Sequence, residues 1–174
     1  MKIERLNGSH DRKSFSCGND SLDAFIHNYA LKKSSIGNID VRVAVYNSNP
    51  GEIIGYYSDI PHSIKYPDTR IDGIPKSKTG NNIYGRLLTK LAVDSKYQKQ
   101  GIGEALIYHM FTCFNKANEI SSQGSAIFVR PLSEQLHSYY NDFGFIQIPD
   151  SKDNIFLMPR ASVEAIVATL NQGF

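Results

Sequence analysis

One stretch of the chain, LLTKLAVDSKYQKQGIGEA at residues 87–105, has residue types and spacing that suit the binding of an anion. Its apolar first part has the length and composition of a buried strand, which ends at Asp94 and Ser95. Gly101 and Gly103 follow, where an amphipathic helical pattern begins. Glycines let the backbone approach a ligand closely, and the first N–H groups of a helix are unpaired and lie at the positive end of its dipole. The expected ligand is therefore a phosphate or a pyrophosphate.

The spacing of the glycines differs from that of the common nucleotide-binding motifs. Gly101-Ile-Gly103 is shorter than G-x-G-x-x-G, and the chain contains no G-x-x-x-x-G-K-S/T. Two glycines alone are most often an ordinary strand-to-helix turn. Here, Gln98-Lys-Gln-Gly101-Ile-Gly103 has the form Arg/Gln-x-x-Gly-x-Gly/Ala directly after the run LAVD. That combination resembles the pyrophosphate loop of the GNAT acetyltransferase superfamily, which binds acetyl-coenzyme A (acetyl-CoA).

Length and composition indicate a single globular domain over residues 1–174. Hydrophobic residues make up 41% of the chain and charged residues 21%, values that are ordinary for a soluble protein. No apolar run approaches the roughly 20 residues of a membrane span, and MKIERLNGSH lacks the apolar segment of a signal peptide. We therefore expect a cytoplasmic protein without a membrane partner. Cys17 and Cys113 are expected to be free thiols, and the spacing of His and Cys predicts no metal site.

The net charge of +2 is unevenly distributed. Residues 62–100 contain eight Lys or Arg against three Asp or Glu, whereas residues 101–174 contain four against seven. Solvated loop lysines account for much of this pattern. A basic middle segment that leads into the glycine loop nevertheless suits an anionic ligand or partner.

Hydrophobic periodicity predicts the elements that must position this loop. The expected strands cover 2–6, 41–46, 53–60, 83–94, 125–129, 145–148 and 155–158, and the expected helices cover 22–30, 102–117, 133–143 and 161–170. Residues 61–82 contain three prolines and no clear periodicity, so we expect a long loop there. Hairpin strands followed by crossover helices imply an α/β (α+β) fold. Its central sheet should be mixed and mostly antiparallel, with helices on both faces.

Further segments resemble one branch of the GNAT superfamily, the toxins of bacterial type II toxin–antitoxin modules. These segments are Phe15-x-Cys-Gly18 with Leu22-x-x-Phe25, Ile53-Ile-Gly-Tyr-Tyr57, Tyr139-Tyr140-Asn-Asp-Phe143-Gly144-Phe145, and Phe156-Leu-Met-Pro159. The resemblance implies transfer of acetyl from acetyl-CoA to the α-amine of an aminoacyl-tRNA. It also implies a small ribbon-helix-helix antitoxin as partner, and we expect a homodimer. The chain departs from its relatives at Lys99-Gln100 inside the loop and at Lys90, where many relatives have Arg.

The resemblance also implies roles for individual residues. The coenzyme would be bound by Leu91, Ala92, Val93, Gln98, Lys99, Gln100, Gly101, Ile102 and Gly103. The main chain of Leu91, Ala92 and Val93 would hydrogen-bond to the pantetheine arm. Tyr140 would be the general acid that protonates the departing thiolate. Lys90 and Lys96 are candidates for contact with the acceptor substrate.

The sequence gives less information about the amine that accepts the acetyl group than about the coenzyme site. No carboxylate or His lies convincingly on the central strand as a general base. An α-amine has a pKa of roughly 7.7–8.0 and is partly neutral at pH 7, whereas a lysine amine at roughly 10.4 needs more help. The absence of a base therefore favours an α-amine. Two alternatives stay open: a GNAT acetyltransferase for a small-molecule amine, peptide or protein, and a non-catalytic acyl-CoA-binding module.

Overall fold

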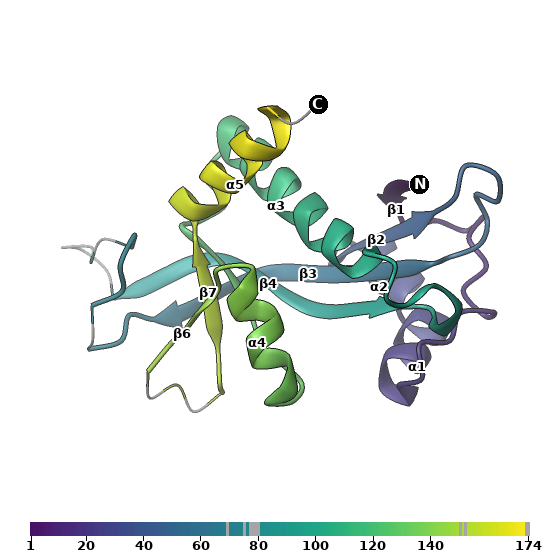
Figure 1. Ribbon diagram of the computed structural model, residues 1–174, viewed down its shortest axis with the longest axis horizontal. Helices are drawn as coiled ribbons and strands as arrows, with labels where there is room; N and C mark the ends of the chain where they lie inside the picture. The colour runs from purple at the N-terminus through teal and green to yellow at the C-terminus, as the bar shows by residue number, and fades with distance from the viewer. Residues whose placement is uncertain (69, 75, 77–80, 150, 152, 173–174) are drawn as a thin grey trace. The chain divides into compact units, whose positions relative to one another are not determined.

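The computed structural model of the protein describes residues 1–68, 70–74, 76, 81–149, 151 and 153–172. Figure 1 labels most of its helices and strands. The strands are β1 (Lys2–Arg5), β2 (Asp40–Val45), β3 (Gly55–Lys65), β4 (Asn82–Val93), β5 (Ala126–Val129), β6 (Ile146–Gln147) and β7 (Phe156–Pro159). The helices are α1 (Asp20–Asn28), α2 (Ala30–Ser35), the 3-10 turn η1 (Ser95–Tyr97), α3 (Ile102–Ile120), α4 (Gln135–Asp142) and α5 (Arg160–Gln172).

The strands of the described residues form one mixed sheet in the order β1-β2-β3-β4-β5-β7-β6. β2 pairs antiparallel with β1 and with β3, and β7 pairs antiparallel with β5 and with β6. β4 and β5 are parallel, because the chain between them crosses over through α3. The predicted fold class, a mixed and mostly antiparallel sheet with helices, is confirmed.

The chain divides into two compact units. Unit 1 contains residues 1–60 and 89–110, and unit 2 contains residues 61–88 and 111–174. Both long central strands, β3 and β4, contribute residues to each unit. The single domain expected over residues 1–174 stays a prediction.

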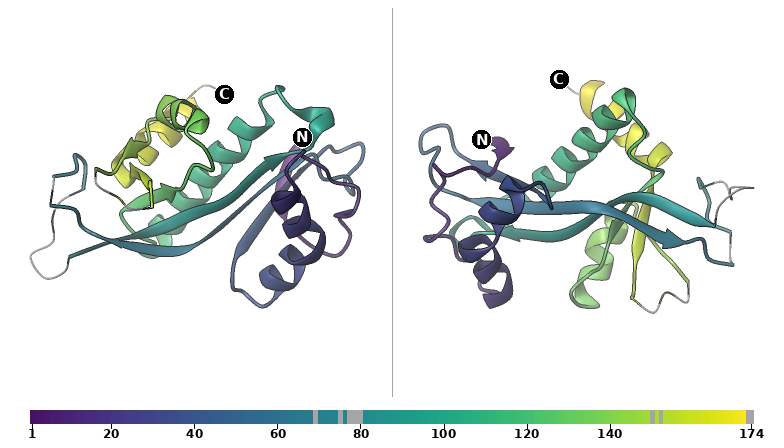
Figure 2. Two further views of the ribbon diagram at one scale, coloured as in Figure 1. Left: turned by 90° about the horizontal axis from the view of Figure 1, so that it is seen from below. Right: turned by 180° about the vertical axis from the view of Figure 1, so that it is seen from behind.

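In unit 1, alternate residues of β3 contact helices on opposite faces of the sheet. Tyr56 packs against α1, where its hydroxyl donates to the Leu22 carbonyl at 2.8 Å. Tyr57 points the other way, and its hydroxyl lies 3.0 Å from Nδ1 of His109 on α3. A Cβ at Gly55 would lie only 3.0 Å from the Ile102 side chain, so glycine lets the start of α3 approach β3 closely. Figure 2 shows α1 and α2 against one face of this part of the sheet.

In unit 2, the short strand β5 is buried along its whole length between β4 and β7. Its parallel register with β4 runs from Gly85 opposite Ala126 to Leu88 opposite Val129. A Cβ at Gly85 would lie 1.8 Å from the Ala126 carbonyl oxygen, so only glycine fits there. The two strands thus meet backbone to backbone at one end of their ladder.

The predicted loop over 61–82 is partly wrong, because β3 continues to Lys65. Proline lacks an N–H donor for a ladder hydrogen bond, yet β3 runs through Pro61. The ladder between β2 and β3 ends at the pair Asp40 and Asp59. Pro61 lies beyond this pair, so no hydrogen bond to β2 is lost by the missing N–H. Part of the predicted loop, at residues 69, 75 and 77–80, lies outside the described residues.

The remaining loop has a small core of its own. Tyr66 is buried, and its hydroxyl donates to the Ile74 carbonyl at 2.8 Å and accepts from the Ile71 N–H at 3.2 Å. Tyrosine therefore closes this loop through its polar end while its ring is shielded from water.

Within the described part of the chain, no helix is long and apolar enough to cross a membrane. The same residues contain no cluster of three His, Cys, Asp or Glu side chains that could hold a metal ion. Neither Cys17 nor Cys113 forms a disulfide in the described structure, and both side chains are half-buried. Burial and the nearby Asp23 raise the pKa of the Cys17 thiol to about 11, so this thiol is protonated at neutral pH.

Candidate functional site

The turn that precedes α3 has two residues in left-handed backbone conformation, Lys99 with φ +61° and Gly101 with φ +78°. The Gly101 carbonyl accepts a hydrogen bond of 3.0 Å from the Ala105 N–H. The N–H groups of Ile102 and Gly103 precede this bond and lie in the first helical turn, which has no carbonyl before it to accept them. A Cβ at Gly101 would meet no atom within 4 Å, so the space above the turn is open. This geometry fits an anion at the helix N-terminus.

The Asp94 side chain holds this turn in place through backbone hydrogen bonds. It is 4% exposed, and its two carboxylate oxygens accept separate backbone hydrogen bonds, one from the Ser16 N–H and one from the Lys96 N–H, each 3.0 Å long. Its own N–H donates to the Ile54 carbonyl at 3.0 Å. The carboxylate therefore joins the turn at Ser16 to the start of η1, and the Asp94 backbone ties both to Ile54, the residue before β3.

The side chain of Gln98 braces the turn from within. Its amide nitrogen donates to the carbonyls of Cys17 and Val93, both at 3.1 Å. The NH2 group of this side chain is therefore already occupied by protein acceptors. Any contact of Gln98 with a phosphate would come from its main-chain N–H. Gln100 makes a similar bond of 3.3 Å to the Lys96 carbonyl.

The predicted main-chain site for the pantetheine arm lies at the end of β4. The register of β4 with β5 ends at Leu88, and Leu91, Ala92 and Val93 lie beyond it. The Ala92 side chain is buried, which is the ordinary behaviour of a core strand. The binding role expected for these three residues depends on their backbone and stays a prediction.

The lysines expected near the acceptor differ in their surroundings. The Lys90 ammonium lies 5.6 Å from the centre of the Phe25 ring, which in turn stacks on Tyr56. A cation over an aromatic face is held by the ring's negative potential, so the aromatic pair fixes the position of this charge. Lys96 on η1 and Lys99 in the turn are both exposed.

Tyr140 lies in unit 2, on α4, and is 6% exposed. Its ring makes edge contacts with Tyr139 and Phe145, at centroid distances of 5.3 and 5.7 Å. Burial and the neighbouring Tyr139 raise the pKa of the Tyr140 hydroxyl, so it keeps its proton at neutral pH. Among the described residues this hydroxyl has no hydrogen-bond partner, and it is not among the side-chain polar atoms sealed from solvent. The ring is therefore packed while the acidic proton stays accessible.

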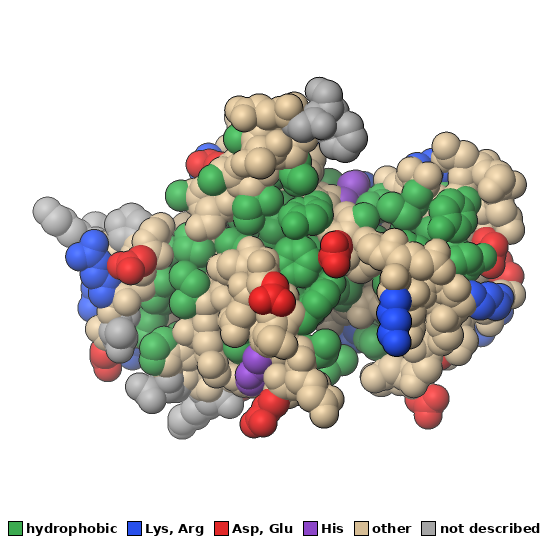
Figure 3. Space-filling model, viewed as in Figure 1, with side chains coloured by type: hydrophobic (Ala, Val, Ile, Leu, Met, Phe, Trp, Pro, Cys, Tyr) green, Lys and Arg blue, Asp and Glu red, His purple; other side chains and the backbone are tan. Residues whose placement is uncertain are grey.

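The segment after α4 fixes Tyr140 through its backbone. The Tyr140 carbonyl accepts from the N–H groups of Phe143 and Phe145, at 3.2 and 3.1 Å. Gly144, between them, has φ +93°, a conformation that favours glycine and ends the helix. Figure 3 shows hydrophobic side chains at the surface beside α4. The motif around Tyr140 thus has a clear structural function as well as a candidate chemical one.

The structure gathers the predicted coenzyme residues, Lys90 and Lys96 in unit 1 and places Tyr140 in unit 2. The family model for the acetyltransferase (GNAT) domain matches residues 39–147, which include β4, the turn before α3 and Tyr140. The chain belongs to the GNAT acetyltransferase family. The family assignment made from Gln98-Lys-Gln-Gly101-Ile-Gly103 is confirmed.

Relatives of this GNAT chain are similar to it over nearly its whole length. A tRNA-acetylating toxin of Mycobacterium tuberculosis (strain ATCC 25618 / H37Rv) is 27% identical over 155 residues, which cover 88% of this chain and 89% of the toxin. A Tyr-to-Phe mutant of KacT is 25% identical with a TM-score of 0.80, and the match covers 95% of this chain and 98% of KacT.

AtaT complexed with acetyl-methionyl-tRNAfMet is 23% identical with a TM-score of 0.83 and covers 95% of this chain and 98% of AtaT, a likeness that shows the fold. A Tyr-to-Phe mutant of AtaT has also been solved bound to acetyl-CoA and to the C-terminus of the antitoxin AtaR.

Sequence reasoning missed two carboxylates of this GNAT domain. Asp94 was interpreted as a residue that only ends the strand, although it organises the turn. The quoted match Phe15-x-Cys-Gly18 carried the missing signal, because this segment supplies the Ser16 and Cys17 contacts beneath the turn. Asp59 was overlooked inside the apolar run of β3, where it is only 6% exposed.

Replacing Asp94 by Asn is expected to weaken the turn. Each carboxylate oxygen accepts a backbone N–H, so an amide would put its NH2 group against one of these donors. We expect a loss of about 1–3 kcal/mol, which lowers Tm by roughly 2–4 °C per kcal/mol, together with weaker acetyl-CoA binding. Thermal unfolding of Asp94→Asn against Asp72→Asn, an exposed aspartate of unit 2, measures the effect. Equal Tm values for the two variants would contradict the assigned role.

Proposed function

We propose that this protein is an acetyl-CoA-dependent N-acetyltransferase that acetylates the α-amine of an aminoacyl-tRNA and thereby blocks translation as a toxin. The observation that carries the coenzyme part is the turn before α3, with its left-handed Lys99 and Gly101 and the open space above it. Its whole-length similarity to a tRNA-acetylating toxin and to AtaT supports the acceptor.

The proposed chemistry assigns a role to the start of α3, to the end of β4 and to Tyr140. The N–H groups at the start of α3 would bind the pyrophosphate of acetyl-CoA, and the end of β4 would hold the pantetheine arm. Attack of the neutral amine on the thioester carbonyl forms the C–N bond of the amide and breaks the C–S bond, which releases the coenzyme thiolate. The proton that the amine nitrogen loses goes to water, because no base is assigned, and water in turn restores the proton that Tyr140 donates. Tyr140, which keeps its proton at neutral pH, would protonate that thiolate.

The proposed acceptor is consistent with the absence of an assigned base. An α-amine with a pKa of roughly 7.7–8.0 presents a useful neutral fraction at pH 7. A lysine acceptor at roughly 10.4 would need a base to remove its proton. The enzyme would then act where aminoacyl-tRNA is made, in the cytoplasm.

An acetylation assay with defined acceptors tests the proposal. Purified protein is incubated with isotope-labelled acetyl-CoA and, in parallel, with total aminoacyl-tRNA, deacylated tRNA, free amino acids and a lysine-containing peptide. We expect label on aminoacyl-tRNA alone, and mass spectrometry of the released N-acetyl-amino acid names the acceptor. Label on free amino acids or on the peptide instead would overturn the tRNA assignment and retain the acetyltransferase. Binding of acetyl-CoA without any transfer would overturn the assigned activity.

We propose a ribbon-helix-helix antitoxin as the protein partner. AtaT binds the C-terminus of its antitoxin AtaR, which supports a partner of this kind. The eight basic residues against three acidic ones in 62–100 suit an acidic tail. Where a small ribbon-helix-helix gene lies beside the gene of this protein, its co-expression should relieve growth arrest and yield a complex in size-exclusion chromatography. Arrest that persists with the neighbour would contradict this partner.

We also propose that the enzyme is a homodimer. Unit 2 exposes large apolar side chains that a second copy could cover, among them Ile120 at 89% and Leu132 at 70% exposure. Light scattering after size-exclusion chromatography measures the mass directly. A mass that stays at 19.5 kDa across the concentration range would show a monomer.

The predicted acceptor-site lysines give a test of tRNA contact. Replacing Lys90 and Lys96 together by Gln should weaken tRNA binding and reduce the slope of log K against log salt by about 2, because each lost phosphate contact removes about 1. The matched control is Lys116→Gln, an exposed lysine of α3 in unit 2. An unchanged slope in the double variant would place the tRNA elsewhere.

A further inference from the structure

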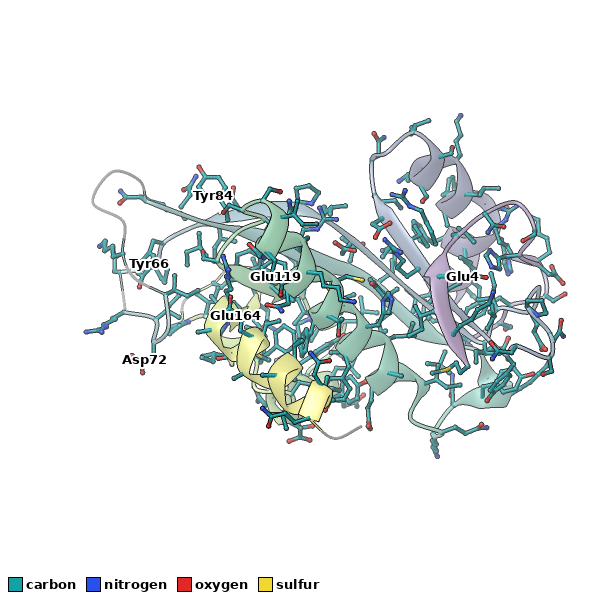
Figure 4. All side chains as sticks on the ribbon, turned by 90° about the horizontal axis from the view of Figure 1, so that it is seen from above. Glu4, Tyr66, Asp72, Tyr84, Glu119 and Glu164 are labelled. Atoms are coloured by element: carbon teal, nitrogen blue, oxygen red, sulfur yellow. The ribbon has the colours of Figure 1, made fainter. Side chains whose placement is uncertain are left out.

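Unit 2 contains a pocket that the proposed acetyl transfer does not use. It has a volume of about 720 Å³ and is lined by residues 61–63 of β3, 84–85 of β4 and 122–124 of the segment between α3 and β5. Figure 4 labels Tyr84 on β4, beside the carboxyl end of α3.

The walls of this pocket are polar but uncharged at neutral pH. None of the described residues that line it is Asp, Glu, Lys or Arg. His62 is the one titratable side chain besides tyrosine among them, and burial lowers its pKa, which favours the neutral imidazole. An anion or a metal ion would find no charged side chain to bind among these lining residues. An uncharged ligand fits the lining better.

Two side chains give the pocket its recognition chemistry. Tyr84 is 61% exposed, an unusual state for a large aromatic ring on a strand of the sheet. Nε2 of His62 is buried without a hydrogen-bond partner among the described residues, while the ring packs edge-on against Phe128 at 5.5 Å. A buried polar nitrogen without a partner costs free energy, and a ligand that bonds it would recover that cost.

The backbone around the pocket is held in place before any ligand arrives. A Cβ at Gly124 would lie 2.4 Å from the Tyr84 carbonyl oxygen, and Gly124 has φ +124°, so glycine brings this segment directly onto β4. The Tyr84 carbonyl also accepts from the Ser125 N–H at 2.8 Å. Gln123 is fixed by a bond from its N–H to Asn118 Oδ1 at 2.9 Å. The backbone of the site is therefore formed in the free protein.

We propose that this pocket binds a nucleobase, which stacks on Tyr84 and hydrogen-bonds to Nε2 of His62. A nucleobase combines a flat face with polar edges and carries no charge, which matches an aromatic wall beside uncharged donors and acceptors. A purely apolar ligand would leave the His62 nitrogen without a partner. The base could belong to a tRNA or to a free nucleoside. The first source rests on the proposed function.

Binding measurements on the full-length protein separate these sources. Adenosine, cytidine and uridine are titrated by saturation-transfer NMR, and deacylated tRNA is titrated separately by filter binding. Tyr84→Leu removes the aromatic face and keeps apolar bulk, whereas Tyr84→Phe keeps the ring and serves as the matched control. Stacking on one aromatic residue corresponds to about a 5- to 150-fold change in affinity. We expect a loss of this size in Tyr84→Leu and none in Tyr84→Phe. His62→Gln should weaken binding as well.

Each outcome decides one point. Loss of tRNA affinity in Tyr84→Leu supports a base of tRNA, whereas loss confined to nucleosides supports a free ligand. Equal affinity of wild type and Tyr84→Leu for every probe, or no binding of any probe, overturns the pocket. The acetylation assay is read independently. Unaltered transfer to aminoacyl-tRNA with an unaltered KM in Tyr84→Leu rejects a tRNA base in the pocket and leaves the proposed function standing. Nucleoside binding that depends on Tyr84, without any acetyl transfer to aminoacyl-tRNA, supports the pocket and overturns the proposed function.

Discussion

Replacing Tyr140 by Phe is expected to lower kcat by about 10²–10⁴-fold, the usual size of general acid catalysis, with little change in folding or acetyl-CoA affinity. Phe keeps the ring that packs against Tyr139 and Phe145 and removes only the hydroxyl. That hydroxyl has no partner among the described residues, so its loss leaves no donor or acceptor unpaired. Steady-state kinetics with aminoacyl-tRNA, calorimetry with acetyl-CoA and thermal unfolding measure the three quantities separately.

The matched control is Tyr139→Phe on the same helix. Tyr139 contacts the rings of Tyr140 and Phe143, so this variant also tests whether the aromatic cluster tolerates loss of a hydroxyl. Full activity in Tyr140→Phe would assign the proton transfer to water or to the substrate. An equal loss of kcat in both variants would show that the geometry of α4, and not one hydroxyl, had been changed.

Periodicity was sufficient to predict the sheet and the helix that follows β4. The apolar run before Asp94 and the glycines after Gln98 define a strand, a turn and a helix start, and each lies where it was expected. At the start of α1, the Asn19 side chain accepts from the Ser21 and Leu22 N–H groups at 3.1 and 3.2 Å, the usual behaviour of an asparagine directly before a helix. Local features of this kind are predictable because their partners are close in sequence.

Features that depend on distant partners were not predictable in this way. Whether Pro61 ends β3 depends on how far β2 reaches, which the residues around Pro61 do not show. The role of Asp94 depends on Ser16, 78 residues earlier in the chain. The pocket next to Tyr84 depends on Gly124, whose backbone meets β4 only after α3 has crossed over. In each case tertiary contact decides the function of the residue.

Replacing Gly101 by Asp is expected to weaken acetyl-CoA binding about 10- to 100-fold. Two unit charges about 5 Å apart repel by roughly 3 kcal/mol at an effective dielectric constant of 20, and tenfold in affinity corresponds to 1.4 kcal/mol. Salt and solvent reduce this repulsion at an exposed turn. The new side chain itself has room, because a Cβ at Gly101 meets no atom within 4 Å.

The control for Gly101→Asp is Gly101→Asn, which separates charge from backbone strain. Both residues must adopt φ +78°, and both tolerate the left-handed region better than other side chains. They have nearly the same shape, so they differ at this turn mainly in the negative charge. Calorimetry should show that Asn binds acetyl-CoA within about threefold of wild type while Asp loses most of its affinity. If both variants bind alike, no phosphate lies at the N-terminus of α3, and the pyrophosphate must be held elsewhere.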